Sequence, residues 1–159
     1  MCACHAHVPL SSPKGEYCTK VKASAPPQGF AHGSDAEYIY HGSTNNMMFV
    51  NICQFGTPEN AQSALTAWKG TEKDKLRALK KSVGDESVLV VNPGLSEDSV
   101  HAFSRSGTVN IRVKIDGAGG DATGAQDMLT ATLKRLQQVQ DGKRATVTTT
   151  EVAAEADKK

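Results

Sequence analysis

The chain begins with a seven-residue stretch, MCACHAH, that holds two thiols and two imidazoles. Cys2, Cys4, His5 and His7 are side-chain types that bind Zn²⁺ or Cu(I). Structural zinc sites usually draw their ligands from two separated pairs that a fold holds together, whereas these four lie within one short leader. A small metal-binding protein that uses this N-terminus is therefore an alternative hypothesis.

The same stretch resembles the end of a lipobox, in which a small residue stands directly before a cysteine that becomes lipidated. Ala3 precedes Cys4, so Cys4 is the candidate lipidation site. This interpretation requires a signal peptide upstream of the given Met1, because the printed residues contain no secretory h-region. Residues 1–15, which include two prolines, then form a flexible leader and tether. If the given start is correct, the protein is cytoplasmic.

Cys18 and Cys53 lie on two segments that we expect to be strands. If the protein is exported, we favour a disulfide between them, because Cys2 and Cys4 belong to the leader. Four cysteines allow three full pairings, and the sequence alone does not choose among them. The alternative is that both thiols are buried and pack as small apolar groups.

No constellation typical of an enzyme is present in the sequence. His32, His41 and His101 are scattered, and no GxSxG elbow accompanies them. The run DGAGGDATG lacks the lysine of a phosphate-binding P-loop, so a turn and a helix capped by Asp121 or Thr123 explain it more simply. We therefore expect a protein that is not an enzyme and needs no cofactor.

The charge balance argues against nucleic acid as a partner. Lys and Arg number 18 against 17 acidic residues, and the formal net charge is +1, whereas phosphate binding needs a concentrated excess of cations. The segment KDKLRALKK is locally basic, and a solvated face explains it most simply, with an acidic partner or an anionic lipid as the alternative. No apolar run approaches the roughly 18 residues of a membrane span, so we expect membrane contact only through a lipid anchor.

Hydrophobic periodicity predicts several strands in the middle of the chain. MMFVNICQF (47–55) is apolar on both faces except at Asn51 and Gln54. In TVNIRVKI (108–115), Val and Ile alternate with polar residues, which is typical of a half-buried antiparallel strand after a turn at Ser106-Gly107. Further strands are expected over 16–23, 37–41, 87–91 and 98–105.

Helix signals interrupt the strands. Thr57 and Pro58 suit the cap and first position of a helix that ends at Gly70. A stripe of Ala, Met and Leu predicts a last helix that follows the run DGAGGDATG, within a folded unit that ends near residue 139. A more exposed helix is expected over 73–81, because Thr71 and Asp74 resemble a capping box.

Together these elements predict an α+β domain over residues 16–139. Short turns between consecutive strands favour an antiparallel β-sheet of about five to six strands, and two or three apolar-striped α-helices should cover one face of it. Residues 140–159 are expected to form a flexible polar tail, in which TVTTTEV could pair as an edge strand.

The runs MMFVNICQFGTPENAQSALTAWK, SVGDESVLVV and HAFSRSGTVNIRVKI, followed by a Gly- and Asp-containing turn and a closing helix, resemble actinobacterial extracytoplasmic domains. They are similar to small secreted lipoproteins and to the sensor-like extracellular domains of mycobacterial Ser/Thr kinases, and APPQGF is more weakly similar to PsbP-like lipoproteins. The resemblance implies export, an α+β domain that is lipid-anchored or secreted, and binding without catalysis. No functional residue of those families maps onto this chain.

The hypothesis that follows is a non-enzymatic extracytoplasmic binding or sensor-like module. We expect a cell-envelope lipoprotein or secreted protein that binds an unidentified envelope ligand or protein. The alternatives are the small Zn- or Cu-binding protein named above and, with no residues in its favour, an enzyme.

Overall fold

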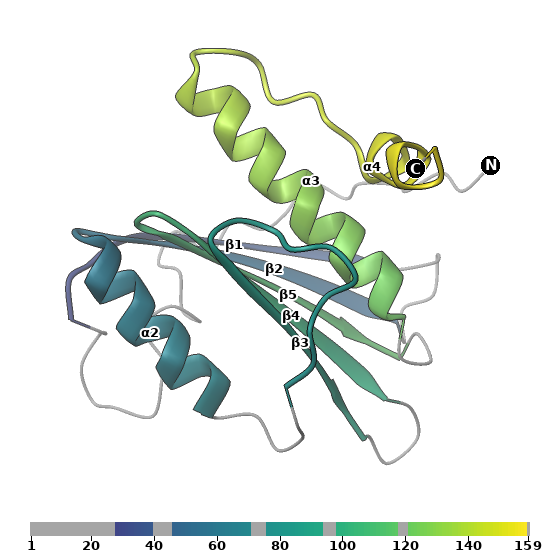
Figure 1. Cartoon of the computed structure of the whole chain (residues 1–159), viewed down its shortest axis with the longest axis horizontal. Helices are drawn as coiled ribbons and strands as arrows, with labels where there is room; N and C mark the ends of the chain where they lie inside the picture. Colours follow the sequence, from purple (N-terminus) through teal and green to yellow (C-terminus); the bar gives the residue numbers. More distant parts are fainter. Residues whose placement is uncertain (1–27, 40–45, 71–75, 94–97, 118–120, 159) are drawn as a thin grey trace.

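The fold is seen in a computed structural model of the chain (Figure 1). It describes residues 28–39, 46–70, 76–93, 98–117 and 121–158. Its elements are β1 (Phe30–Ile39), β2 (Met47–Phe55), α2 (Pro58–Gly70), β3 (Glu86–Asn92), β4 (Ser99–Ser106), β5 (Val109–Asp116), α3 (Ala122–Gln140) and α4 (Thr149–Ala156).

The five strands form one antiparallel sheet in the order β1-β2-β5-β4-β3. The α+β class and the antiparallel sheet predicted from the sequence are therefore confirmed. β2 and β5 lie side by side in the middle, although α2, β3 and β4 separate them along the chain. The predicted strand over 16–23 lies outside the described residues.

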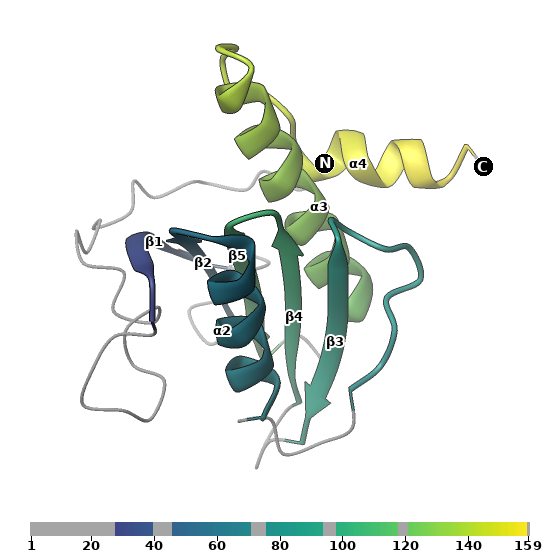
Figure 2. The ribbon, with the colours of Figure 1, turned by 60° about the vertical axis from the view of Figure 1, so that its left-hand side comes forward.

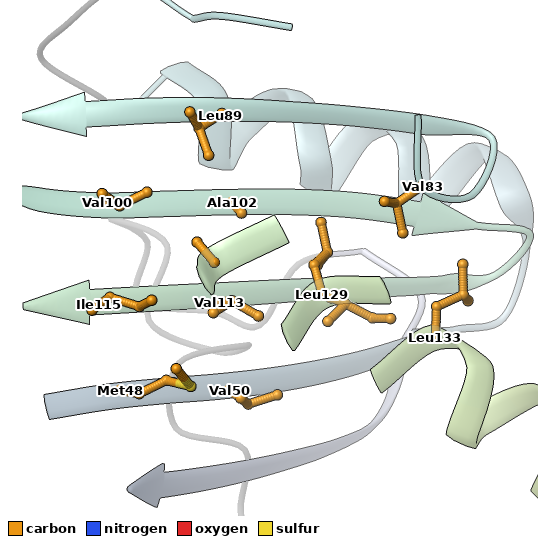
Figure 3. Close-up of a cluster of buried hydrophobic side chains, with 12 residues drawn as sticks. Met48, Val50, Val83, Leu89, Val100, Ala102, Val113, Ile115, Leu129 and Leu133 are labelled. Carbon is orange, nitrogen blue, oxygen red and sulfur yellow. The ribbon is translucent and has the colours of Figure 1, made fainter. Parts of the chain in front are cut away.

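One face of the sheet packs against α3. Val50 on β2, Val113 on β5 and Ala102 on β4 are cross-strand partners, and all three side chains point to this face. Figure 3 shows Leu129 and Leu133 of α3 lying over these strands. The stripe predicted for the last helix supplies this contact, and we call this side the α3 face.

The opposite face, here called the α2 face, packs against α2 (Figure 2). Trp68 of α2 lies with its ring centroid 6.2 Å from that of Phe103 on β4. Phe55 and Val90 belong to the same buried cluster. Asn110 on β5 donates a hydrogen bond from Nδ2 to the carbonyl oxygen of Ala61, at 2.8 Å, which ties the helix to the centre of the sheet.

The prediction that the helices share one face of the sheet is therefore wrong in that detail. The reason is visible in β2 and β4, which bury apolar side chains on both faces: Val50 and Ala102 on one, Phe55 and Phe103 on the other. A strand that is apolar on both faces needs a cover on each side.

Residues 76–81 are not helical, so the helix predicted over 73–81 is wrong where the structure describes it. Arg77 instead forms an isolated antiparallel bridge with Leu89 on β3. Its N–H donates to the Leu89 carbonyl at 2.7 Å, and the Leu89 N–H donates to the Arg77 carbonyl at 2.9 Å. These bonds pair backbone groups at the edge of the sheet, which a local helix would leave unpaired.

The C-terminal segment, which we expect to be a flexible polar tail, contains the helix α4. Thr148 and Glu151 form a complete capping box at the start of α4. Val152 is 7% exposed, and Lys134 of α3 pairs with Glu155 of α4 at 2.5 Å. A cap, one buried apolar side chain and an ion pair fix this helix against α3, and TVTTTEV forms no edge strand.

Candidate functional site

Most of the residues singled out from the sequence lie outside the described residues. Cys2, Cys4, His5, His7 and Cys18 all fall within residues 1–27. The metal site, the lipidation site and the disulfide therefore stay predictions. Cys53 is described, and it is fully buried on the α2 face of β2.

The described histidines do not form a site together. His32 on β1 is opposite Gln54, whereas His101 on β4 is opposite Lys114, and the strand register places these two pairs on opposite faces of the sheet. His41 lies outside the described residues. Within the described part of the chain, no group of three or more His, Cys, Asp or Glu side chains could hold a metal ion.

The glycine-rich turn before α3 ends in a helix cap, as the sequence predicts. Asp121 accepts a hydrogen bond on Oδ1 from the N–H of Gly124 at 2.8 Å. A carboxylate already occupies the positive end of this helix, so an external anion would meet a negative charge there.

The structure brings together a group of polar side chains that sequence analysis did not assemble. It lies on the α2 face, on the three strands β1, β2 and β5, whereas α2 packs on β4, on the Phe55 end of β2 and on the Asn110 end of β5. We call it the charged patch, and its members are Asp35, Glu37, Phe49, Asn51, Arg112, Lys114 and Asp116.

A hydrogen-bonded row crosses the charged patch from β1 to β5. Asn51 donates from Nδ2 to Oδ1 of Asp35 at 2.7 Å. Arg112 donates from Nη1 to Oδ1 of Asn51 at 3.0 Å. Asn51 and Arg112 are only 5% and 8% exposed. Because a buried hydrogen-bonded network holds its members in one geometry, the guanidinium is fixed in position.

The neighbouring row holds a second cation. The Lys114 ammonium lies 5.4 Å from the centroid of the Phe49 ring and 2.5 Å from Oδ2 of Asp116. Its side chain is 27% exposed and that of Asp116 is 32% exposed, so both reach solvent. Arg112 and Lys114 are two residues apart on β5 and therefore point to the same side of the sheet. The patch thus presents a buried guanidinium beside an accessible ammonium.

One residue in the sequence, Asn51, indicates this patch, but the alternation of apolar and polar residues in β5 predicts a different exposure of its side chains. Alternation predicts that Asn110, Arg112 and Lys114 face solvent, yet Asn110 is fully buried and Arg112 nearly so. Asn51, the one polar residue within the buried centre of β2, marks the place where this face changes from apolar to polar. Its partner on β5 is decided by the register of two strands that are distant in the chain.

Comparisons with known proteins add one similarity of fold. No protein-family model matches the chain, and no curated protein matches it either. Among solved structures, the chain is similar to the extracellular domain of PknH from Mycobacterium tuberculosis, with a TM-score of 0.46 and 16% sequence identity. The match covers 67% of this chain and 66% of that domain, just under two thirds of its length.

None of the helices within the described residues is both long and apolar enough to cross a membrane.

Proposed function

We propose that this chain is a non-enzymatic binding or sensor-like module that acts outside the cytoplasm, and that the charged patch is its binding surface. The observation that carries the proposal is the row Asp35–Asn51–Arg112, which orients a guanidinium beside the accessible ammonium of Lys114. The accessible Lys114 ammonium, with the buried Arg112 guanidinium on the same side of β5, suits a ligand that carries a carboxylate or a phosphate, because charge-assisted hydrogen bonds to such groups are strong.

The patch has the features of a binding surface and lacks those of a catalytic centre. Lys114 is paired with Asp116, and Arg112 is held by Asn51, so both cations have an ordered starting position. An arriving anion would compete with Asp116 for the ammonium without any change of the backbone. No nucleophile is hydrogen-bonded to a general base within the described residues of the patch.

Titration with inorganic phosphate and with acetate, followed by amide NMR shifts, tests the binding surface. We expect shifts at residues 49–51 and 112–116, and an affinity about tenfold weaker in Lys114→Gln, since one charge-assisted hydrogen bond is lost. Lys134→Gln is the matched control, because Lys134 also pairs with a carboxylate at 2.5 Å, but on α3. Equal weakening in both variants, or no shift at about 10 mM ligand, would refute the charged patch as the site.

The extracytoplasmic part of the proposal includes lipid on Cys4 and a disulfide between Cys18 and Cys53. Cys53 is opposite Gly33 on β1, which has no side chain, so a second sulfur can approach Cys53 from that side. A disulfide at Cys53 requires the Cα atom of its partner to lie within about 7 Å.

The intact mass of the protein from its native host tests both modifications together. The expected differences from the printed sequence are the loss of residues 1–3, a diacylglyceryl group on Cys4 as the mature N-terminus, and the loss of two hydrogens for one disulfide. A mass that matches the unmodified, fully reduced chain would remove the lipoprotein and disulfide parts of the proposal and leave the charged patch to its own test.

A further inference from the structure

A second surface with a distinct character lies at the other edge of the sheet, beside β3. It consists of Leu76, Arg77, Lys80 and Lys81, and we call it the basic strip. All four side chains are exposed, and no acidic residue occurs between positions 76 and 84. The sheet order places β1 and β3 at opposite edges, so the basic strip is separate from the charged patch.

The backbone of the basic strip is held in place by the domain. Two hydrogen bonds join Arg77 to Leu89, and the N–H of Lys80 donates to Oε1 of Gln126 on α3 at 3.1 Å. Leu79, between them, packs against the core of the α3 face. The backbone that carries the cations is therefore fixed in position.

The strip combines positive charge with an exposed apolar side chain. Leu76 is 44% exposed, one of only two large apolar residues of the described chain that are exposed, with Val139. No ion pair within the described residues involves the side chain of Lys80 or Lys81. The nearest acid after the strip, Asp85, is already paired with Arg105 at 3.1 Å.

We infer that the basic strip is a contact site for an anionic lipid surface. Lys and Arg near such a surface each strengthen binding by roughly fivefold, and a leucine beside them can enter the headgroup region. Long cationic side chains suit this position, because their stems cover apolar surface while their charges stay in the polar layer.

A membrane fits the strip better than an acidic protein does. A stable protein–protein interface buries about 800 Å² per partner and uses a packed apolar centre. The strip offers one leucine and three cations along an extended segment, which is too little for such a centre. A lipid surface needs no shape complementarity, since each cation interacts with it separately.

Vesicle flotation with the full chain tests this inference. The probes are vesicles of phosphatidylcholine alone and vesicles that contain about one third phosphatidylglycerol, at low salt, where electrostatic attraction has its longest range. We expect binding only to the anionic vesicles. We expect a loss of at least about 25-fold in the double variant Lys80→Glu/Lys81→Glu, since two cations are removed.

The matched control is Lys143→Glu/Arg144→Glu, which reverses two exposed neighbouring cations in the segment between α3 and α4. It should bind nearly as the parent does, and both variants should keep the parent's melting temperature. Absence of binding to anionic vesicles, equal binding to neutral vesicles, or an equal loss in the control would overturn the inference. Retention on an acidic protein column without vesicle binding would assign the strip to a protein partner instead. None of these results depends on the charged patch.

Discussion

At the scale of single residues, the tripeptide Val83-Gly84-Asp85 is held by close contacts with the end of β4. Gly84 has φ +74°, and a Cβ at this position would lie 2.4 Å from the carbonyl oxygen of Arg105. Ser104 donates from Oγ to the Val83 carbonyl at 2.6 Å, and the Asp85 N–H donates to the Arg105 carbonyl at 2.8 Å. This tripeptide therefore joins the start of β3 closely to the end of β4.

Gly84→Ala should lower the free energy of unfolding by more than about 2 kcal/mol, because it adds a steric overlap with backbone to an unfavourable φ. Gly107→Ala separates the two effects. Gly107 also has positive φ, at +56°, but nothing lies within 4 Å of its Cβ position, so a loss of about 1 kcal/mol is expected. Urea denaturation of both variants is the measurement, and equal losses would contradict the close approach at Gly84.

At the scale of elements, α4 depends on its cap. Thr148 accepts the Glu151 N–H on Oγ1 at 3.2 Å, and Glu151 accepts the Thr148 N–H at 2.8 Å. Thr148→Ala should reduce amide-exchange protection across residues 152–157 about fivefold, since a cap contributes about 1 kcal/mol. Thr150→Ala, two residues further on and exposed, should leave protection nearly unchanged. Equal protection in the two variants would show that the cap does not hold α4.

The contact between α3 and α4 also contains an unfavourable charge. Burial raises the pKa of Asp127, and the nearby carboxylates of Asp121 and Asp157 raise it further. When the pKa of an acid is higher in the folded than in the unfolded state, the protein is most stable below the unfolded pKa, which is about 3.9 for Asp. The free energy of unfolding then decreases as the pH rises through the folded pKa.

Asp127→Asn should therefore raise the melting temperature at pH 7, by up to about 3 °C, and have little effect near pH 3, where the parent carboxyl is neutral as well. Thermal unfolding across this pH range is the measurement. A gain of the same size at both pH values would mean that the charge of Asp127 plays no part.

Glu86 shows the opposite electrostatic behaviour at the other helix. Its carboxylate pairs with Lys69 of α2 and accepts a hydrogen bond from Nε2 of Gln62 at 2.9 Å. These bonds, that of Lys69 first, lower the pKa of Glu86. The contribution of this contact to stability is therefore present above about pH 4.3 and is lost as the pH falls through the folded pKa.

Elements with a local signal were predictable, and those that depend on distant partners were not. The strand over 47–55 and the helix from Pro58 to Gly70 match β2 and α2 residue for residue, because apolar periodicity and the Thr57-Pro58 start mark them. Residues 76–81 have leucines at helical spacing, but the backbone pairs with Leu89 instead. The residues of the α4 capping box can be read from the sequence, but few large apolar residues surround them, so no helix was predicted there.

The charged patch could not be derived without the sheet register. Asn51 and Arg112 meet because β2 pairs with β5, and Asp35 joins them because β1 pairs with β2. Each side chain by itself is an ordinary polar residue of a strand. Only the cross-strand alignment turns them into one hydrogen-bonded row.

At the scale of the whole molecule, β2 and β5 form a seam between two parts of the chain. β1, β2 and α2 lie in the part of the chain that ends at Gly70, and the remaining strands with α3 and α4 follow Leu76. The seam pairs Met47 with Asp116 and Gln54 with Val109, and α2 crosses it to pack on Phe103. Contacts across the seam join residues far apart in sequence, so their formation is the slow step that we expect in folding.

This seam makes the domain suitable for reconstitution from two polypeptides. A break between Gly70 and Leu76 would leave one fragment with the β1-β2 hairpin and the other with the β3-β4-β5 meander, and it would expose an unpaired edge on β2 and on β5 together with apolar surface. Residues 1–73 and 74–159, co-expressed, should assemble into a complex that co-elutes and melts cooperatively, whereas each fragment alone should aggregate or stay unfolded. A fragment that folds by itself would show that pairing between β2 and β5 is not required for folding. If the two fragments were fused to two interacting proteins, their assembly would report that those proteins are close together.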